Sequence, residues 1–133
     1  SNKQLFSLKR ILRFLIERYQ INLKNVLGHS DIALTRKKDP GEKFPWKDLS
    51  KKKLCIWHTL NENKLIKFRN KKISSIKEKF FFKNLNKIGY DTSSIIKNRK
   101  YVITAFHRRF RPELINSNID EESYLISKNL ISL

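Results

Sequence analysis

The sequence predicts a mainly α-helical fold that contains one short remnant strand and ends in a small bundle of three helices. Apolar residues recur at steps of three and four in the amino-terminal segment and in three segments of the carboxyl-terminal half, which is typical of a helix with one buried face. A short apolar run, Asn25-Val26-Leu27, fits a strand instead. No apolar run approaches the roughly 18 residues that a membrane span needs.

The first half of the chain predicts two helices, with a strand and a long loop between them. The helix over 3–19 carries its polar side chains opposite an apolar face made of Leu5, Leu8, Leu12, Leu15, Ile16 and Tyr19. The strand over 25–27 ends at Gly28, and residues 30–46 show no periodicity and include Pro40, Gly41 and Pro45. Loops of this length are typically functional or disordered. A short basic helix is predicted from Trp46 to Leu54.

The second half predicts a polar linker over 58–72 and then three helices. The first helix begins near Ile73 and stops at Gly89, which suits a left-handed cap. The second covers 98–110 and is closed by Pro112, and Asp120 is suited to cap the third. About 60 residues are near the lower size limit for an independent bundle.

Length, cysteine content and charge exclude several classes of protein. The 133 residues fit one domain of ordinary size, and a lone Cys55 allows neither an internal disulfide nor a thiolate zinc cluster. The net charge of +18 attracts polyanions, but Lys, Asn and Ile supply 49 of the 133 residues, which indicates a composition bias. Because no helix-turn-helix or RNP segment is present, we expect only non-specific binding of nucleic acid.

The segment 28–46, GHSDIALTRKKDPGEKFPW, combines groups suited to chemistry. His29 and Asp39 offer an imidazole nitrogen and a carboxylate oxygen, which are ordinary zinc ligands. A catalytic zinc uses three protein ligands and keeps a fourth position for water, whose pKa it lowers. From residue types alone, other interpretations stay open: His29 as a packed or surface residue, Asp31 as a turn organiser, and Lys37 as a solvated lysine.

This segment resembles the type-2 zinc N-acetylmuramoyl-L-alanine amidases, and most closely the envelope subgroup that also cleaves anhydro-muropeptides. The resemblance rests on fixed spacing over 19 residues. The matching positions are Gly28, His29, Ser30, Asp31, Ile32, Ala33, Arg36, Lys37, Asp39, Pro40, Gly41, Phe44, Pro45 and Trp46. The resemblance implies that His29 and Asp39 are zinc ligands and that Lys37 stabilises the negative charge of the tetrahedral intermediate.

The carboxyl-terminal half resembles the helical peptidoglycan-binding-like domain that follows the catalytic domain in this subgroup. The matching residues are Gly89, Tyr90, Ala105, Phe106, Phe110, Arg111, Pro112 and Asp120. The resemblance divides the chain into the carboxyl-terminal portion of a catalytic domain over 1–57, a linker over 58–72 and a helical domain over 73–133. His107 and Arg109 stand where relatives more often have Gln and His, and we expect His107 on the helix surface.

The resemblance also shows what this sequence does not supply. The family's first zinc-binding His and its general-base Glu belong upstream of the matching segment, so the zinc site in this chain is incomplete. We therefore expect this chain to be the carboxyl-terminal part of an amidase, with little or no activity alone. The resemblance implies that the complete enzyme acts on peptidoglycan or muropeptides in the cell envelope. An upstream chain from a split gene would complete the amidase. Two alternatives stay open: a non-catalytic module that binds peptidoglycan or polyanions, and the remnant of a decaying gene.

Overall fold

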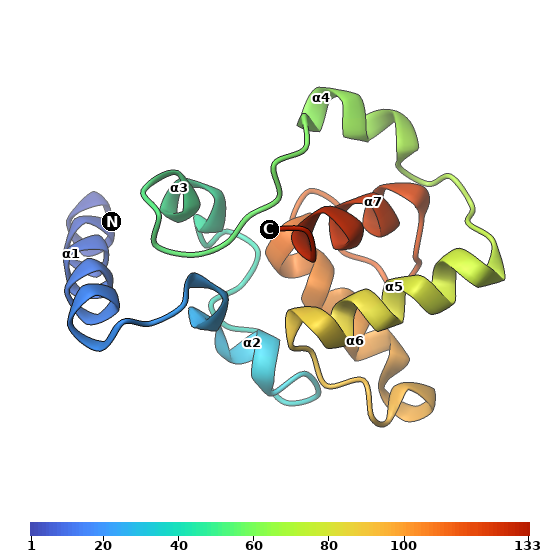
Figure 1. Cartoon of the computed structure of the whole chain (residues 1–133), viewed down its shortest axis with the longest axis horizontal. Helices are drawn as coiled ribbons and strands as arrows, with labels where there is room; N and C mark the ends of the chain where they lie inside the picture. The colour runs from blue at the N-terminus through green and yellow to red at the C-terminus, as the bar shows by residue number, and fades with distance from the viewer. The chain divides into compact units, whose positions relative to one another are not determined.

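The computed structural model describes residues 1–133, and every regular element in it is a helix. The elements are α1 (Asn2–Tyr19), η1 (Leu23–Asn25), α2 (His29–Ile32), α3 (Trp46–Lys51), α4 (Glu62–Leu65), η2 (Ile66–Phe68), α5 (Ser75–Ile88), α6 (Ile95–Phe110) and α7 (Glu121–Leu130) (Figure 1). None of these helices combines the length and the apolar character that a membrane crossing requires. The chain forms two compact units: residues 1–27 with 45–57 make the first, and residues 28–44 with 58–133 make the second.

The mainly α-helical class is confirmed, whereas the short strand over 25–27 is not present. Leu23–Asn25 instead form a single 3-10 turn, capped by the side chain of Asn22, which accepts a hydrogen bond from the Lys24 amide at 3.0 Å. Val26 has extended backbone angles (φ −86°, ψ 99°), but no neighbouring strand pairs with it. A strand needs a partner for its backbone groups, so an extended residue without one stays a loop.

In the first unit, α1 is a regular helix that buries none of its residues. Ser1 and Gln4 form a capping box at its start, and Gln20 ends it in the left-handed conformation. Its predicted leucines are only half-buried, while Phe6 and Phe14 are more than 60% exposed. The well-buried side chains of this unit lie in and just after α3, and they are Trp46, Leu49, Leu54 and Cys55.

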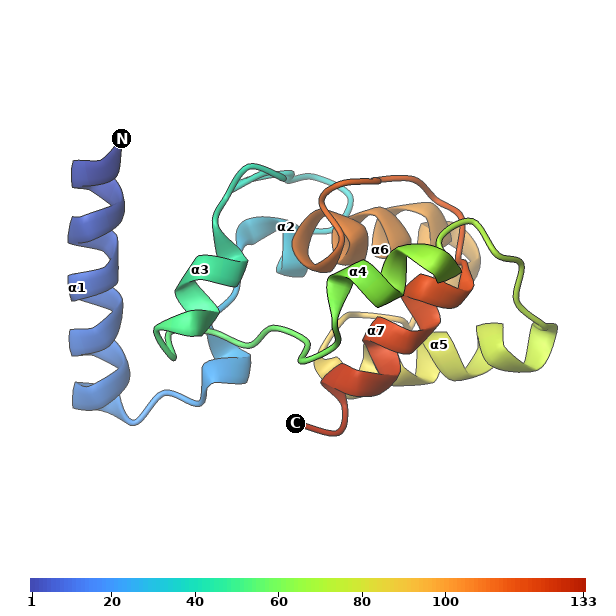
Figure 2. The same cartoon turned by 90° about the horizontal axis from the view of Figure 1, so that it is seen from above.

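In the second unit, α5, α6 and α7 form the predicted bundle of three helices (Figure 2). Its core centres on Phe106, whose ring meets those of Phe81 and Phe110 at centroid distances of 5.3 Å and that of Tyr90 at 6.3 Å. The predicted stop of the first of these helices at Gly89 is confirmed, since this residue has a φ of 119° and its amide bonds to the Leu85 carbonyl at 3.1 Å.

Arginine–carboxylate pairs fix the ends of the bundle. Arg111 donates to Asp120 at 2.6 Å, and Asp120 also caps α7 by accepting from the Ser123 amide at 2.9 Å. Arg69 forms two hydrogen bonds with Glu122, at 2.7 and 2.9 Å. Arg69 directly follows η2, within the segment 58–72 that the sequence predicts to be a linker. This segment contains the short helices α4 and η2, and Arg69 ties it to Glu122 of α7.

The prediction that His107 lies on a helix surface is wrong, because its side chain is fully buried. Its Nδ1 lies 2.7 Å from the carbonyl oxygen of Asn116, and its Nε2 lies 2.8 Å from the hydroxyl of Ser123. Helical spacing from Ile103 to His107 and on to Phe110 places this ring on the apolar face, and two polar partners there satisfy it. Burial, followed by the charge of Arg111, lowers the pKa of His107 to about 4.

Candidate metal centre

The site segment begins with the one-turn helix α2, of which His29 is the first residue. The sequence predicts a strand directly before His29, but the structure has a loop there that ends at Gly28. The Gly28 amide donates a hydrogen bond to the Asp31 carboxylate at 2.9 Å. The middle of this turn is buried and its ends are exposed: Ser30 and Asp31 are buried, while His29 and Ile32 are exposed. The turn therefore presents the imidazole to solvent and anchors the residues that follow it.

The structure brings His29 and Asp39 together. The Nδ1 atom of His29 lies 2.6 Å from Oδ2 of Asp39, and their side chains are 72% and 56% exposed. The backbone supports this pairing, because the Ser30 amide donates to the Asp39 carbonyl at 2.9 Å. Asp39, Pro40 and Gly41 form a turn: the Gly41 amide donates to the Lys38 carbonyl at 2.9 Å, and Gly41 has a φ of 80°. The Asp39–Pro40 peptide bond is cis.

The surroundings of Asp39 favour its ionised form. The hydrogen bond from His29 lowers the pKa of the Asp39 carboxyl below its ordinary value, and the charges of His29 and Lys37 act in the same direction. Lys37 is exposed, and its backbone amide donates to the Ala33 carbonyl at 2.9 Å. The three predicted site residues thus lie exposed on one segment, and the charges of His29 and Lys37 both act on Asp39.

The pair suits a zinc ion in its chemistry, because an imidazole nitrogen and a carboxylate oxygen are ordinary zinc ligands. An imidazole nitrogen and a carboxylate oxygen in direct contact are converging donors, and a metal ion would take the place of the proton that they share. The structure contains no group of three or more His, Cys, Asp or Glu side chains that could hold a metal. The chemistry of His29 and Asp39 therefore fits part of a zinc site, and their role as ligands stays a prediction.

Sequence reasoning missed two residues that reach this loop from the helical bundle. Arg109, in α6, donates to Oδ2 of Asp31 at 2.6 Å, and the hydroxyl of Tyr90 donates to Oδ1 at 2.8 Å. Arg109 is 2% exposed, and burial raises the pKa of Tyr90 well above its ordinary value. The sequence did contain a signal, since Arg109 lies beside Phe110 on the apolar face of the predicted helix. A buried arginine requires a carboxylate partner, so this position could have indicated a buried ion pair.

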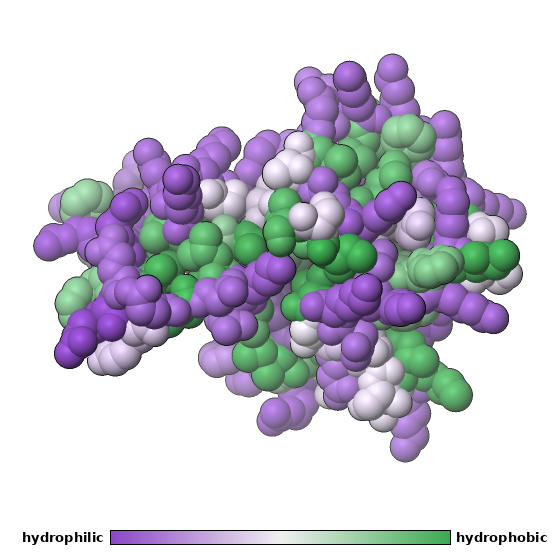
Figure 3. Space-filling model, in the orientation of Figure 1, coloured by the Kyte–Doolittle hydropathy of each residue, from purple (hydrophilic) through white to green (hydrophobic).

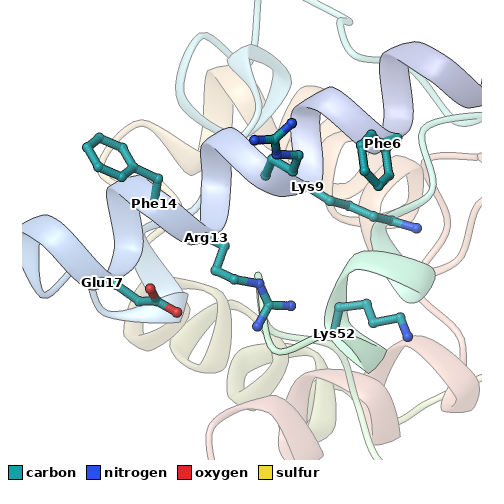
Figure 4. A pocket seen from close by; sticks show the side chains of 7 residues that line it. Phe6, Lys9, Arg13, Phe14, Glu17 and Lys52 are labelled. Atoms are coloured by element: carbon teal, nitrogen blue, oxygen red, sulfur yellow. The ribbon is translucent and has the colours of Figure 1, made fainter.

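A separate hollow of about 600 Å³ lies in the first unit, along one side of α1 (Figure 4). Figure 4 shows Arg13, from α1, and Lys52, which directly follows α3, among the side chains that line it. The lining residues are Phe6, Lys9, Arg10, Arg13, Phe14, Glu17 and Lys52, so cations predominate and none of the predicted site residues takes part.

Comparison with known proteins supports the resemblance at both ends of the chain. Residues 1–42 match the Amidase_2 family, described as N-acetylmuramoyl-L-alanine amidase. The curated N-acetylmuramoyl-L-alanine amidase AmiD of Escherichia coli strain K12 is 30% identical over 130 residues, which are 96% of this chain and 47% of AmiD.

Solved structures show the same similarity in three dimensions. The complex of Escherichia coli AmiD with the substrate anhydro-N-acetylmuramic acid-L-Ala-D-gamma-Glu-L-Lys has a TM-score of 0.81 at 30% identity, covering 97% of this chain and 51% of AmiD. AmpDh3 of Pseudomonas aeruginosa has a TM-score of 0.82 at 27% identity, covering 99% of this chain and 53% of AmpDh3.

Together these matches show the class of protein that the chain resembles: the type-2 N-acetylmuramoyl-L-alanine amidases, by the family match over residues 1–42 and by similarity over nearly the whole chain to solved structures. AmiD and AmpDh3 are two such relatives, and the chain spans about half the length of each.

Proposed function

We propose that this chain carries part of the active site of a zinc-dependent peptidoglycan amidase, with His29 and Asp39 as two of its zinc ligands. The contact of 2.6 Å between the Nδ1 atom of His29 and Oδ2 of Asp39 carries the proposal. The bond cleaved would be the amide between the lactyl group of N-acetylmuramic acid and the L-alanine of the stem peptide. Zinc would supply a bound water of lowered pKa and would polarise the amide carbonyl.

In this proposal Lys37 stabilises the negative charge that develops on the carbonyl oxygen. A positioned cation near a developing oxyanion is usually a large contribution to catalysis. Lys37 suits this role because its ammonium group is exposed and its charge already acts on Asp39. The remaining His ligand and a general-base Glu would come from an upstream chain, and the chain alone would have little or no activity.

The proposed substrates are muropeptides, and the proposed location is the cell envelope. Among the relatives, AmiD was solved with an anhydro-muropeptide substrate and AmpDh3 with anhydromuramic pentapeptide. The division into a catalytic portion over 1–57, a linker over 58–72 and a peptidoglycan-binding-like domain over 73–133 stays a prediction.

Zinc titration of the whole chain by calorimetry tests the ligand assignment. We expect zinc binding that is lost in His29→Ala and in Asp39→Asn. Asp48→Asn is the matched control, since Asp48 is also an exposed carboxylate in an ion pair but lies outside the site segment. Zinc affinity that is equal in wild type and His29→Ala would refute the assignment.

Incubation of the chain with zinc and muropeptides tests the second part of the proposal. We expect no release of free stem peptide by the chain alone. Release should appear when the missing His and Glu are supplied by an upstream segment, and Lys37→Ala should then reduce the turnover more than Lys38→Ala. Robust zinc-dependent release by the chain alone would contradict the incomplete site.

Binding of peptidoglycan or another polyanion by the helical bundle is a second candidate, supported by charge. Residues 64–111 contain 15 Lys and Arg against 2 acidic residues, and hydrophilic side chains cover much of the face in Figure 3. Some of these cations already form ion pairs with carboxylates of the same chain. They are Arg69, Lys77, Arg99, Arg109 and Arg111. Sedimentation with insoluble peptidoglycan over a salt series tests the candidate. Binding that disappears at moderate salt and that DNA matches would indicate charge attraction alone.

A further inference from the structure

The one-turn helix α2 presents His29 to solvent, but four residues cannot hold a helix in place by themselves. Its fixed point is Asp31, whose side chain is only 4% exposed, whereas that of His29 is 72% exposed. The two residues are separated by one position, so the orientation of the imidazole depends on how Asp31 is held.

Asp31 is held from the helical bundle. Its Oδ2 accepts hydrogen bonds from Nη1 of Arg109 at 2.6 Å and from the Gly28 amide at 2.9 Å, and its Oδ1 accepts from the Tyr90 hydroxyl at 2.8 Å. Arg109 is 78 positions away in the sequence and Tyr90 is 59. Both lie beside the aromatic core: Arg109 lies 5.1 Å from the centroid of the Phe110 ring, and Tyr90 contacts Phe106 edge-on.

These contacts give both donors fixed positions. Tyr90 follows the left-handed cap at Gly89, so the end of α5 determines where its ring lies. Arg109 is in the last turn of α6, and α2 packs against this helix. A guanidinium and a phenol that are both anchored in a packed core hold a carboxylate more rigidly than a surface loop could.

We propose that Arg109 and Tyr90 are positioning residues for the metal centre, acting on His29 through Asp31. The helical bundle is then a structural part of the catalytic site and does more than attach the protein to the cell wall. This inference rests on the proposed function, because it assigns to His29 the role of a zinc ligand. Contacts around metal ligands typically change metal affinity by about 10- to 100-fold when they are removed.

The test compares two isosteric variants that each remove one buried hydroxyl. Tyr90→Phe removes the hydrogen bond to Asp31. Ser127→Ala removes the bond that Ser127 accepts from Asn84 at 3.1 Å between α5 and α7, and the bond that it donates to the Tyr124 carbonyl at 2.8 Å within α7. Both variants remove one hydroxyl from the interior of the bundle, but only Tyr90→Phe removes a bond to the loop. We expect Tyr90→Phe to weaken zinc binding by about tenfold and Ser127→Ala to leave it within about twofold.

Amide hydrogen exchange provides a readout that needs no metal. The Gly28 amide bonds to Asp31, and the Ser30 amide bonds to the carbonyl of Asp39, so the exchange of the two reports the alignment of the loop. We expect faster exchange at both amides in Tyr90→Phe and in Arg109→Lys, with unchanged exchange at Val102 in the core of α6. Ser127→Ala should leave the loop amides unchanged.

Equal zinc affinities and equal loop exchange in Tyr90→Phe and Ser127→Ala would overturn the inference, since both residues would then only stabilise the bundle. The proposed function has a separate readout. If His29→Ala leaves zinc binding unchanged, the ligand assignment is refuted, and the positioning of His29 for zinc is refuted with it. The exchange data then still show whether Tyr90 and Arg109 hold the loop.

Discussion

Lowering the pH from neutral to about 4 should destabilise the second unit through His107. The pKa of this imidazole falls from 6.5 to about 4 on folding, because the ring is buried and faces Arg111. A lowered folded pKa means that the unfolded chain binds the proton first. The stability due to neutral His107 is therefore complete above pH 6.5, declines as the pH falls, and is lost at about pH 4.

The size of this effect follows from the shift. A difference of 2.5 units between 6.5 and about 4 corresponds to about 3 kcal/mol, at about 1.4 kcal/mol per unit. The groups that face the ring are Arg111, Asn116, Ser123 and Asp120. Asp120 also has a lowered pKa, but the stability that it contributes is lost at more acidic pH, below 3.8.

Urea unfolding over this pH range, in wild type and His107→Gln, measures the effect. Both tryptophans, Trp46 and Trp57, are in the first unit, so fluorescence reports on the wrong part of the chain. Circular dichroism or amide exchange at Val102 is the suitable probe. The glutamine variant should be less stable at neutral pH but should lose less stability between pH 6.5 and 4. Parallel losses in the two proteins would show that His107 does not cause the pH dependence.

Three further predictions concern the bundle. Gly89→Ala should lower the free energy of unfolding by about 1 kcal/mol, because alanine rarely adopts the φ of 119° that Gly89 has, although the space for a methyl group is open. Urea unfolding measures this change, and an unchanged free energy of unfolding would contradict the predicted backbone strain. Arg111→Leu should cost about 3–5 kcal/mol by leaving Asp120 and Glu122 without their shared cation, which would be seen as the loss of cooperative thermal unfolding. Phe106→Ala should cost about 3–5 kcal/mol in urea, and a loss below about 1 kcal/mol would show that the aromatic core adjusts without it.

Much of the fold could be predicted from sequence because helices signal themselves locally. The spacing of apolar residues predicted α1, α5 and α6, and local caps predicted the glycine stop at Gly89 and the start of α7 after Asp120. The predicted strand over 25–27 is absent from the structure, because a strand depends on a partner that local sequence does not show.

The candidate site divides in a similar way. His29, Lys37 and Asp39 belong to one short motif, and the resemblance of that motif to the amidases was enough to single them out. Tyr90 and Arg109 act on this loop from far along the chain, and only the folded bundle brings them to Asp31. His107 was misplaced because a polar residue type was given more weight than helical spacing.

Because α1 buries none of its residues, its backbone depends on local hydrogen bonds and end caps. Such a helix opens often, and a protease cuts open segments first. Trypsin cleaves after Lys and Arg, so brief digestion should cut near Lys9, Arg10 and Arg13 while the bond after the buried Arg109 stays intact. A resistant fragment that retains α5, α6 and α7 would then be the first stable product.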